Sequence, residues 1–185
     1  MKKIAKLLII VIIIAIIVAT LLLIFKNKKT VLSSEQALEV ATEKYNNLLN
    51  YAQADGMNLS GNDNNPEGYK FDNKLYLKIE NYDETVKNDV YQDYMQTYSN
   101  IARIIEKDGE HYISIDSIDR KKDKTYESTQ LIIKSITKDE IICDAESFYI
   151  SYDEKGNKTS SKVAQEFKLK LDKKTWKVSQ FELPY

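Results

Sequence analysis

The chain has 185 residues, with 27 basic and 28 acidic side chains, one histidine and one cysteine. A single cysteine excludes an intramolecular disulfide, and one cysteine with one histidine cannot supply the usual ligand set of a zinc site. We therefore expect a fold that is held together by its apolar core and that contains no metal and no cofactor.

The N-terminal part of the chain is basic and then apolar. Leu7–Phe25 contains nothing more polar than Thr20, and its nineteen residues at helical rise span roughly 28 Å, about the thickness of the hydrocarbon core of a bilayer. Lysines flank the run on both sides, so the positive-inside rule does not orient it. With only six residues before it, the run predicts an uncleaved signal anchor and an exported C-terminal domain; the alternative is a cleaved signal peptide and a secreted protein.

Charge divides the chain into a basic anchor, residues 1–29, and an acidic extracytoplasmic domain, residues 30–185. The anchor holds six lysines and no acidic residue, which leaves 21 basic and 28 acidic residues in the domain, a net charge of −7. Such a domain lacks the basic patch that binding to phosphates requires, so we do not expect nucleic acid as a partner. The acidic balance favours either solubility alone or steering toward a cationic partner.

The first element after the anchor is predicted to be a helix. Ser33-Ser34-Glu35-Gln36 has the pattern of a capping box, and apolar residues then recur at helical spacing to about Ala52. The apolar residues of this stripe are Leu38, Ala41, Tyr45, Leu48 and Leu49. The segment from Asp55 to Gly68, rich in Gly, Asn and Asp, is typical of a loop.

A short strand and a second helix are expected next. Apolar residues at alternate positions indicate an extended segment over 71–79. Asp83 is placed to cap a helix whose apolar stripe extends from Val86 to Ile105. Asp108-Gly109 either ends this helix or turns the chain into the following strand.

From His111 onward the hydrophobic period changes from helical to two. A short alternating run is followed by a charged loop, 119–124, and then by four β-rich runs. These runs cover 125–137, 140–152, 158–171 and 176–183. Helices followed by antiparallel strands predict an α+β fold, in which two or three helices pack on a curved antiparallel meander of four to five strands.

The C-terminal segment is expected to be a closing strand and not a polar tail. Trp176, Phe181 and Leu183 are large apolar residues, and the alternation changes parity around Ser179-Gln180. Such a change of parity predicts a β-bulge. The segment is therefore expected to belong to the core.

The sequence contains no recognisable catalytic motif. It has no G-x-S-x-G, no P-loop and no H-E-x-x-H. His111 is expected to be a partly buried structural residue, and Cys143 a small core residue. No pair of carboxylates stands isolated in an apolar setting, so we do not predict an enzyme. Thirteen tyrosines instead favour either a binding surface or the wall of a helix-sheet core.

Six stretches in order along residues 33–185 carry a likeness to a known family. They are S-S-E-Q-A-L, E-N-Y-D-E-T-V, I-I-E-K-D-G-E-H-Y-I, T-K-D-E-I-I, D-E-K-G-N-K and the ending W-K-V-S-Q-F-E-L-P-Y. Together they resemble the IseA-type inhibitors of bacterial cell-wall D,L-endopeptidases. This resemblance implies an exported, non-enzymatic protein that restrains autolysis by occluding the active-site cleft of a cysteine peptidase that cuts peptidoglycan peptides.

The same order of helices and strands is also similar to the cystatin-like and nuclear-transport-factor-like folds. That likeness implies a different role, as an assembly module of a cell-envelope secretion, transfer or sporulation complex. Both roles predict a protein partner, either a cell-wall hydrolase or another component of the envelope, with attachment to the membrane through residues 7–25.

The loop after the His111 strand is the surface that we expect to meet the partner. The residues proposed for this contact are Asp116, Asp119 and Asp123, with Tyr112 and Tyr126 at the base of the loop. Alternation along the strand places Tyr112, Ser114 and Asp116 on one face, which is expected to be exposed. An acidic loop with aromatic anchors suits a partner of opposite charge; the alternative is that the loop is a solvated connection.

Overall fold

The structure, a computed structural model, describes residues 31–60, 68–118 and 120–185. The predicted anchor and membrane span lie outside these residues, as do residues 61–67 of the predicted loop and the candidate Asp119. No helix among the described residues is long and apolar enough to cross a bilayer. Leu32–Tyr185 form one unit, whose elements give the α+β class that the sequence predicts.

The described chain contains short helices and eight strands. The helical elements are α2 (Ser34–Tyr51), α3 (Val86–Asp89), η1 (Gln92–Tyr94, a 3-10 helix), α4 (Met95–Ala102) and α5 (Ile115–Ile118). The strands are β1 (Gly68–Phe71), β2 (Lys74–Lys78), β3 (Ile104–Lys107), β4 (Glu110–Ser114), β5 (Tyr126–Ile136), β6 (Glu140–Tyr152), β7 (Lys158–Asp172) and β8 (Thr175–Gln180).

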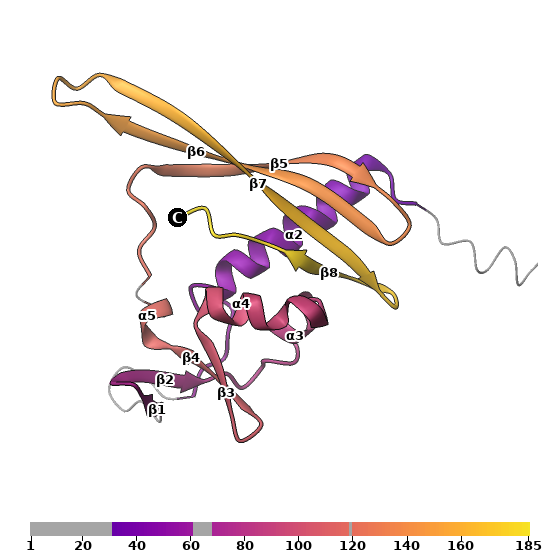
Figure 1. The fold of residues 1–185 in the computed structure, drawn as a ribbon, viewed down its shortest axis with the longest axis vertical. Coiled ribbons are helices and arrows are strands. Elements are labelled where there is room, and N and C mark those ends of the chain that lie inside the picture. The colour runs from indigo at the N-terminus through magenta and orange to yellow at the C-terminus, as the bar shows by residue number, and fades with distance from the viewer. Residues whose placement is uncertain (1–30, 61–67, 119) are drawn as a thin grey trace, which may run out of the picture. The chain divides into compact units, whose positions relative to one another are not determined.

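The strands form two four-stranded antiparallel sheets (Figure 1). The second sheet has the order β5-β6-β7-β8, a meander in which each strand pairs with the next along the chain. The first sheet has the order β1-β2-β4-β3. The predicted meander of four to five strands therefore describes only the second sheet. Of the first sheet, the sequence predicted β2 and β4 as short extended segments. It did not predict β1 or β3, because four residues are too few to show a clear alternation.

Helix α2 begins where the sequence predicts. Ser33 is its N-cap: the Ser33 hydroxyl accepts from the backbone N–H of Gln36 at 3.2 Å, and the Gln36 side chain accepts from the backbone N–H of Ser33 at 3.1 Å. These two bonds satisfy backbone donors that the first turn leaves unpaired. One part of the predicted stripe is wrong, because Leu38 is exposed, and the buried face includes Ala37 and Lys44 instead.

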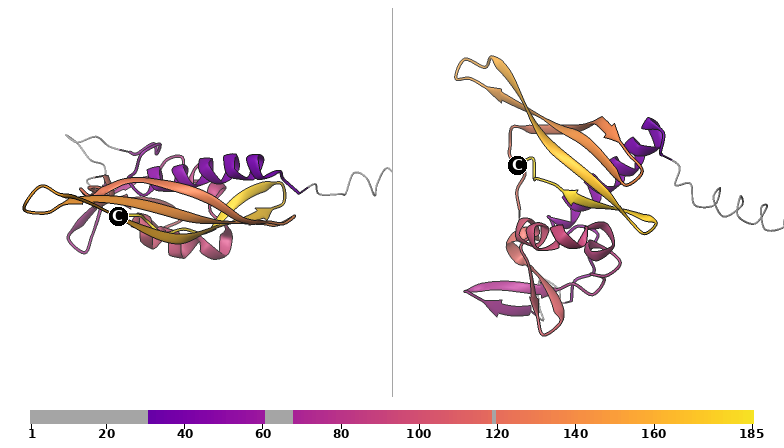
Figure 2. Two further views of the ribbon diagram at one scale, coloured as in Figure 1. Left: turned by 90° about the horizontal axis from the view of Figure 1, so that it is seen from above. Right: turned by 45° about the vertical axis from the view of Figure 1, so that its right-hand side comes forward.

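Helix α2 packs along one face of the β5–β8 sheet (Figures 1 and 2). The ring of Tyr45 contacts Phe167 of β7 and Phe181 edge-on, with centroids 5.2 and 5.3 Å apart. Alternate residues of β6 are buried in the same core, namely Ile141, Cys143, Ala145 and Ser147. On the alternate set of positions, ion pairs such as Lys134–Asp144, at 3.1 Å, join neighbouring strands.

The predicted second helix is broken into pieces. The chain leaves the helical conformation at Val90, which is extended and forms a parallel bridge with Val178 of β8. The Tyr91 N–H donates to the Val178 carbonyl at 2.8 Å. Arg103, with φ of 59°, ends α4 in the left-handed conformation, and the chain enters β3 directly. The spacing of the apolar residues predicts one continuous helix. The structure has a backbone hydrogen bond to the distant strand β8 in place of the helical hydrogen bonds at this point.

A buried ion pair joins α3 to α2. The Lys44 ammonium donates to Asp89 Oδ1 at 2.6 Å, and Asp89 Oδ2 accepts from Asn47 Nδ2 at 2.8 Å and from the Tyr51 hydroxyl at 3.1 Å. Only 10% of the Lys44 side chain and 3% of the Asp89 side chain are exposed. Burial and the neighbouring Asp89 charge raise the pKa of Tyr51, so its hydroxyl stays a donor in this network.

The C-terminal segment belongs to the core, as predicted. Phe181 is completely buried, and Trp176 and Leu183 are partly buried against the core. The predicted bulge is confirmed: Val178 pairs with Leu169 and Gln180 with Lys168, so Ser179 is an extra residue on β8.

Candidate functional site

Two of the predicted partner-binding residues lie at the β1–β4 sheet. Tyr112 lies in the central strand β4, in register with Lys78 on one side and Ile105 on the other, and is partly buried. Asp116 lies in α5, where its carboxylate is 3.4 Å from the Lys74 ammonium. Ser114, which the alternation places on an exposed face, is buried. That expectation was wrong because the strand ends at Ser114 and the chain turns into α5.

The other two described candidates lie at the start of β5. Asp123 Oδ1 accepts from the Thr125 backbone N–H and hydroxyl, both at 2.7 Å. These hydrogen bonds hold the pKa of Asp123 below its usual range. Tyr126 is partly buried, and its hydroxyl is 2.9 Å from Thr129 Oγ1. Of the four described candidates, Tyr112 and Asp116 thus precede the loop and Asp123 and Tyr126 lie at its end next to β5. Their use by a partner stays a prediction.

The described part of this loop is basic and not acidic. Residues 120–124 read Arg-Lys-Lys-Asp-Lys, with four positive charges and one negative. The Lys122 ammonium lies over the Tyr185 ring at 6.0 Å from its centroid. Asp123 is the one acidic side chain of this stretch, and it caps the turn into β5.

Tyrosines join the start of β5 to the C-terminal segment. The ring of Tyr126 packs edge-on against Tyr185 and Tyr149, with centroids 5.0 and 6.0 Å apart. The Tyr149 hydroxyl donates to the Pro184 carbonyl, and Gln53 donates to the Tyr185 hydroxyl. Burial raises the pKa of Tyr185 to about 12. Other tyrosines belong to the core, namely Tyr45, Tyr51, Tyr82 and Tyr98, which is one of the two roles that the sequence left open for its tyrosines.

The most exposed structured element is the end of the β6–β7 hairpin, Ser151–Ser160, which we call the arm. Strand β5 pairs with β6 no further than Tyr149, and β8 pairs with β7 only over Lys168–Asp172. The arm therefore extends beyond both neighbouring strands (Figure 1). All of its residues are exposed, and 68% of the Tyr152 surface is accessible.

The turn of the arm is ordered by its own side chains. Asp153 Oδ1 accepts from the backbone N–H groups of Lys155 and Asn157, both at 2.8 Å, and Asp153 Oδ2 accepts from the Asn157 side chain at 2.8 Å. The bond from the Asn157 side chain is the main reason that the pKa of Asp153 lies below its usual range. Gly156 takes a φ of +79°, which a side chain would strain. The arm is therefore a preformed hairpin with a fixed tip.

Sequence reasoning predicted the hairpin turn but not that the strands continue beyond the sheet. A signal for this was present in the first half of β7. From Lys158 to Ala164 the chain has only one large apolar residue, Val163, so neither face of this part has a stripe to bury. A strand with polar side chains on both faces is not expected to pack against another sheet or helix.

The one cysteine and the one histidine of the sequence lie in different sheets. Cys143 is buried in β6, and burial raises the pKa of its thiol to about 11, which keeps it protonated at neutral pH. His111 in β4 stacks on Tyr82 with ring centroids 3.5 Å apart, and burial lowers its pKa. Within the described ranges, no group of three or more His, Cys, Asp or Glu residues is arranged to hold a metal ion.

Comparison with known proteins gives no match to this chain, either among family models or among curated protein sequences.

Proposed function

We propose that residues 30–185 form an extracytoplasmic, non-enzymatic inhibitor of peptidoglycan D,L-endopeptidases, anchored in the membrane by residues 7–25. In this proposal the arm enters the active-site cleft of the peptidase and occludes it. The observation that carries the proposal is the projection of the arm beyond β5 and β8, with every residue from Ser151 to Ser160 exposed.

The shape of the arm supports insertion into a cleft. A cleft that binds an extended peptide substrate can pair its main chain with an open strand edge, which is a common mode of peptide recognition. In the arm, the edge of β7 away from β6 has no strand neighbour among the described residues. The arm is extended before it binds, and its turn is held by Asp153. Little conformational entropy is therefore lost on binding.

Tyr152 is the side chain best placed to anchor the arm. A tyrosine has few rotatable bonds and a large contact area, and such residues carry much of the binding energy in protein interfaces. Tyr152 stands next to the turn and is the most exposed large hydrophobic side chain in the described part of the domain. The likeness to IseA-type inhibitors supports a peptidase as the partner, and the preformed arm supports a mechanism that needs no chemistry from the inhibitor.

A shortened arm provides the test. Ser151 and Thr159 are paired across the hairpin, so Tyr152–Lys158 can be replaced by Asn-Gly, which closes a two-residue turn. Purified full-length chain, kept in solution by a mild detergent, is mixed with a purified D,L-endopeptidase, and the release of peptides from peptidoglycan is measured. We expect inhibition by the native chain, loss of inhibition by the shortened arm, and inhibition about tenfold weaker for Tyr152→Ala.

Lys174→Ala provides the matched control, because Lys174 is exposed in the turn between β7 and β8, at the other end of β7. It should inhibit as the native chain does. Equal inhibition by the native and shortened chains would contradict the role of the arm, and no inhibition by the native chain at large molar excess over several such enzymes would contradict the proposed function.

The second candidate is an assembly module of a cell-envelope complex. The open edge of β7 favours it, because Lys158–Phe167 have no strand neighbour on the side away from β6 within the described part of the chain. Such an edge can accept a strand from another protein. This function predicts an envelope protein that co-purifies with the native chain and no effect on the peptidases.

A further inference from the structure

The chain contains only two arginines, Arg103 and Arg120, and both line the same pocket. The pocket has a volume of about 610 Å³, within the range of ligand sites in proteins. The other residues that line it are Ile101, Lys121, Glu182, Leu183 and Tyr185. It is separate from the arm, and the inference does not depend on the proposed function.

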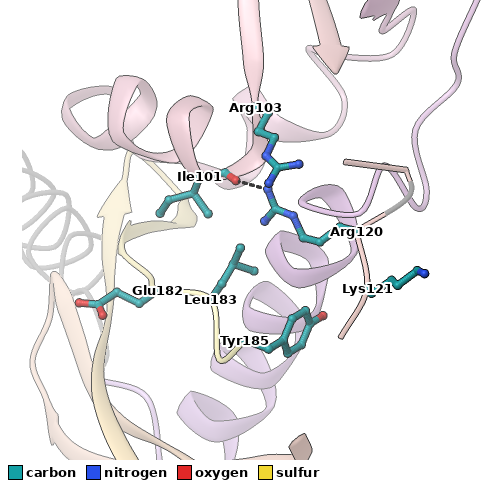
Figure 3. Close-up of a pocket in the computed structure, with 7 residues that line it drawn as sticks. All are labelled: Ile101, Arg103, Arg120, Lys121, Glu182, Leu183 and Tyr185. Carbon is teal, nitrogen blue, oxygen red and sulfur yellow. Dashed lines mark hydrogen bonds between the residues drawn. The ribbon is translucent and has the colours of Figure 1, made fainter. Parts of the chain in front are cut away.

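The main-chain bonds of the two arginines fix their positions. Arg120 Nη2 donates to the Ile101 carbonyl near the end of α4, at 2.8 Å. Arg103 Nη1 donates to the Asp116 carbonyl, also at 2.8 Å. Figure 3 shows the two guanidinium groups pointing toward each other at one side of the pocket. Most cationic side chains of this protein are lysines, whereas these two arginines are held in place by main-chain carbonyls.

The guanidinium groups keep unused hydrogen-bond donors. Each has five N–H groups, and neither forms an ion pair with a carboxylate among the described residues. The Nε of Arg120 is buried and has no hydrogen-bond partner among the residues that the structure describes. Burial lowers the pKa of Arg120, and the positive charge of Arg103 lowers it further. A negatively charged group between them would supply an acceptor for these donors and offset the repulsion.

We propose that this pocket binds a carboxylate attached to an apolar group, with Arg103 and Arg120 as the two ligands of the carboxylate. Two guanidinium forks match the planar geometry of a carboxylate. Ile101, Leu183 and the Tyr185 ring form an apolar wall for the adjoining group. Lys121 and Glu182 contribute opposite charges to the same lining, so the preference for this carboxylate over inorganic phosphate is expected from the apolar wall beside the arginines.

The two arginines make the test unusually direct. A spectrum of arginine side-chain Nε–H groups from the full-length chain in detergent micelles contains two signals, which Arg103→Gln and Arg120→Gln assign. We expect N-acetyl-leucine to shift both signals with one common dissociation constant, and acetate to shift them more weakly. N-acetyl-leucine amide, which lacks the carboxylate, should shift neither, and inorganic phosphate at equal ionic strength should bind more weakly than N-acetyl-leucine.

Variants separate a site from general charge effects. Arg103→Gln should weaken binding of N-acetyl-leucine about tenfold, as observed at the Arg120 signal, because it removes one charged donor group. Arg103→Lys, which keeps the charge but not the planar fork, should also weaken it. Lys155→Gln removes one positive charge at the tip of the arm and should change nothing. Equal shifts with sodium chloride, different dissociation constants for the two signals, or unchanged binding in Arg103→Gln would overturn the proposal.

Discussion

The inner and outer halves of the β6–β7 hairpin have the same pairing and opposite surroundings. Antiparallel pairing runs without a register shift from Glu140–Lys170 to Tyr152–Lys158. In the inner half, alternate residues of β6 are completely or almost completely buried under α2, whereas every residue of the arm is exposed. A two-stranded ribbon alone is only marginally stable in water. The packed inner half therefore keeps the arm in its hairpin conformation, while the surface of the arm stays open to a partner.

The largest expected effect comes from removing residues at the packed end. Deletion of Trp176–Tyr185 removes β8 and the fully buried Phe181, and large apolar side chains contribute on the order of 1.5–3 kcal/mol each when buried. We expect the cooperative thermal transition of the full chain to disappear. The shortened arm, in which two residues replace the seven from Tyr152 to Lys158, should keep its transition, measured by circular dichroism. A cooperative melt after deletion of Trp176–Tyr185 would contradict the packed role of this end.

Removing one partner of the buried ion pair should have the next largest effect. Asp89→Ala leaves the buried Lys44 ammonium with only the exposed Glu43 carboxylate at 3.5 Å, which costs about 3–5 kcal/mol of unfolding free energy. The matched control is Asp83→Ala, which breaks the exposed Asp83–Lys87 pair at 2.9 Å and should cost about 0.3–0.5 kcal/mol. Urea unfolding measures both, and similar losses would show that burial does not distinguish the two pairs.

How far the sequence predicts this fold depends on the length of each element. The long strands β5 to β8, the capping box at Ser33 and the bulge at Ser179 were predicted, because each leaves a local pattern in the chain. The broken helix was not predicted, because the bridge between Val90 and Val178 joins segments far apart in sequence. Pairing between distant segments leaves no periodic signal in either of them.

The use of the candidate site residues by a partner stays a prediction. The loop after β4 was chosen for its aspartates, although its described part carries more positive than negative charge. The pairing of Arg103 with Arg120 depends on the turn at α5 and on the path of the C-terminal segment, which a sequence pattern does not specify. The sequence signal for these two residues was that they are its only arginines, beside 25 lysines.

A local change in the arm should have a smaller effect. Gly156→Ala places a side chain at φ of +79°, with open space around it, so the expected cost is conformational strain of about 1–2 kcal/mol. Because the arm has no layer packed on it, we expect faster hydrogen exchange in Ser151–Ser160 and an unchanged melting temperature. A matching fall in the melting temperature would mean that the arm is coupled to the core.

The smallest expected effect is a pH dependence in the first sheet. Burial lowers the pKa of His111 in the folded state from 6.5, partly offset by Glu106, so the unfolded chain binds this proton more readily. The contribution of His111 to stability is therefore complete above pH 6.5 and is lost as the pH falls through the folded-state pKa. His111→Phe keeps a ring against Tyr82 and should reduce the loss of stability between about pH 7 and 5. An unchanged pH profile would contradict this assignment.

Inhibition kinetics test the central claim, occlusion of a peptidase cleft by the arm, most directly. A soluble peptide substrate is titrated against a D,L-endopeptidase at several fixed concentrations of the full-length chain. We predict competitive inhibition, in which the apparent KM rises with inhibitor concentration and kcat is unchanged. With the shortened arm, the apparent KM should equal its uninhibited value. A fall in kcat at constant KM, or the same inhibition by the shortened arm, would contradict the account.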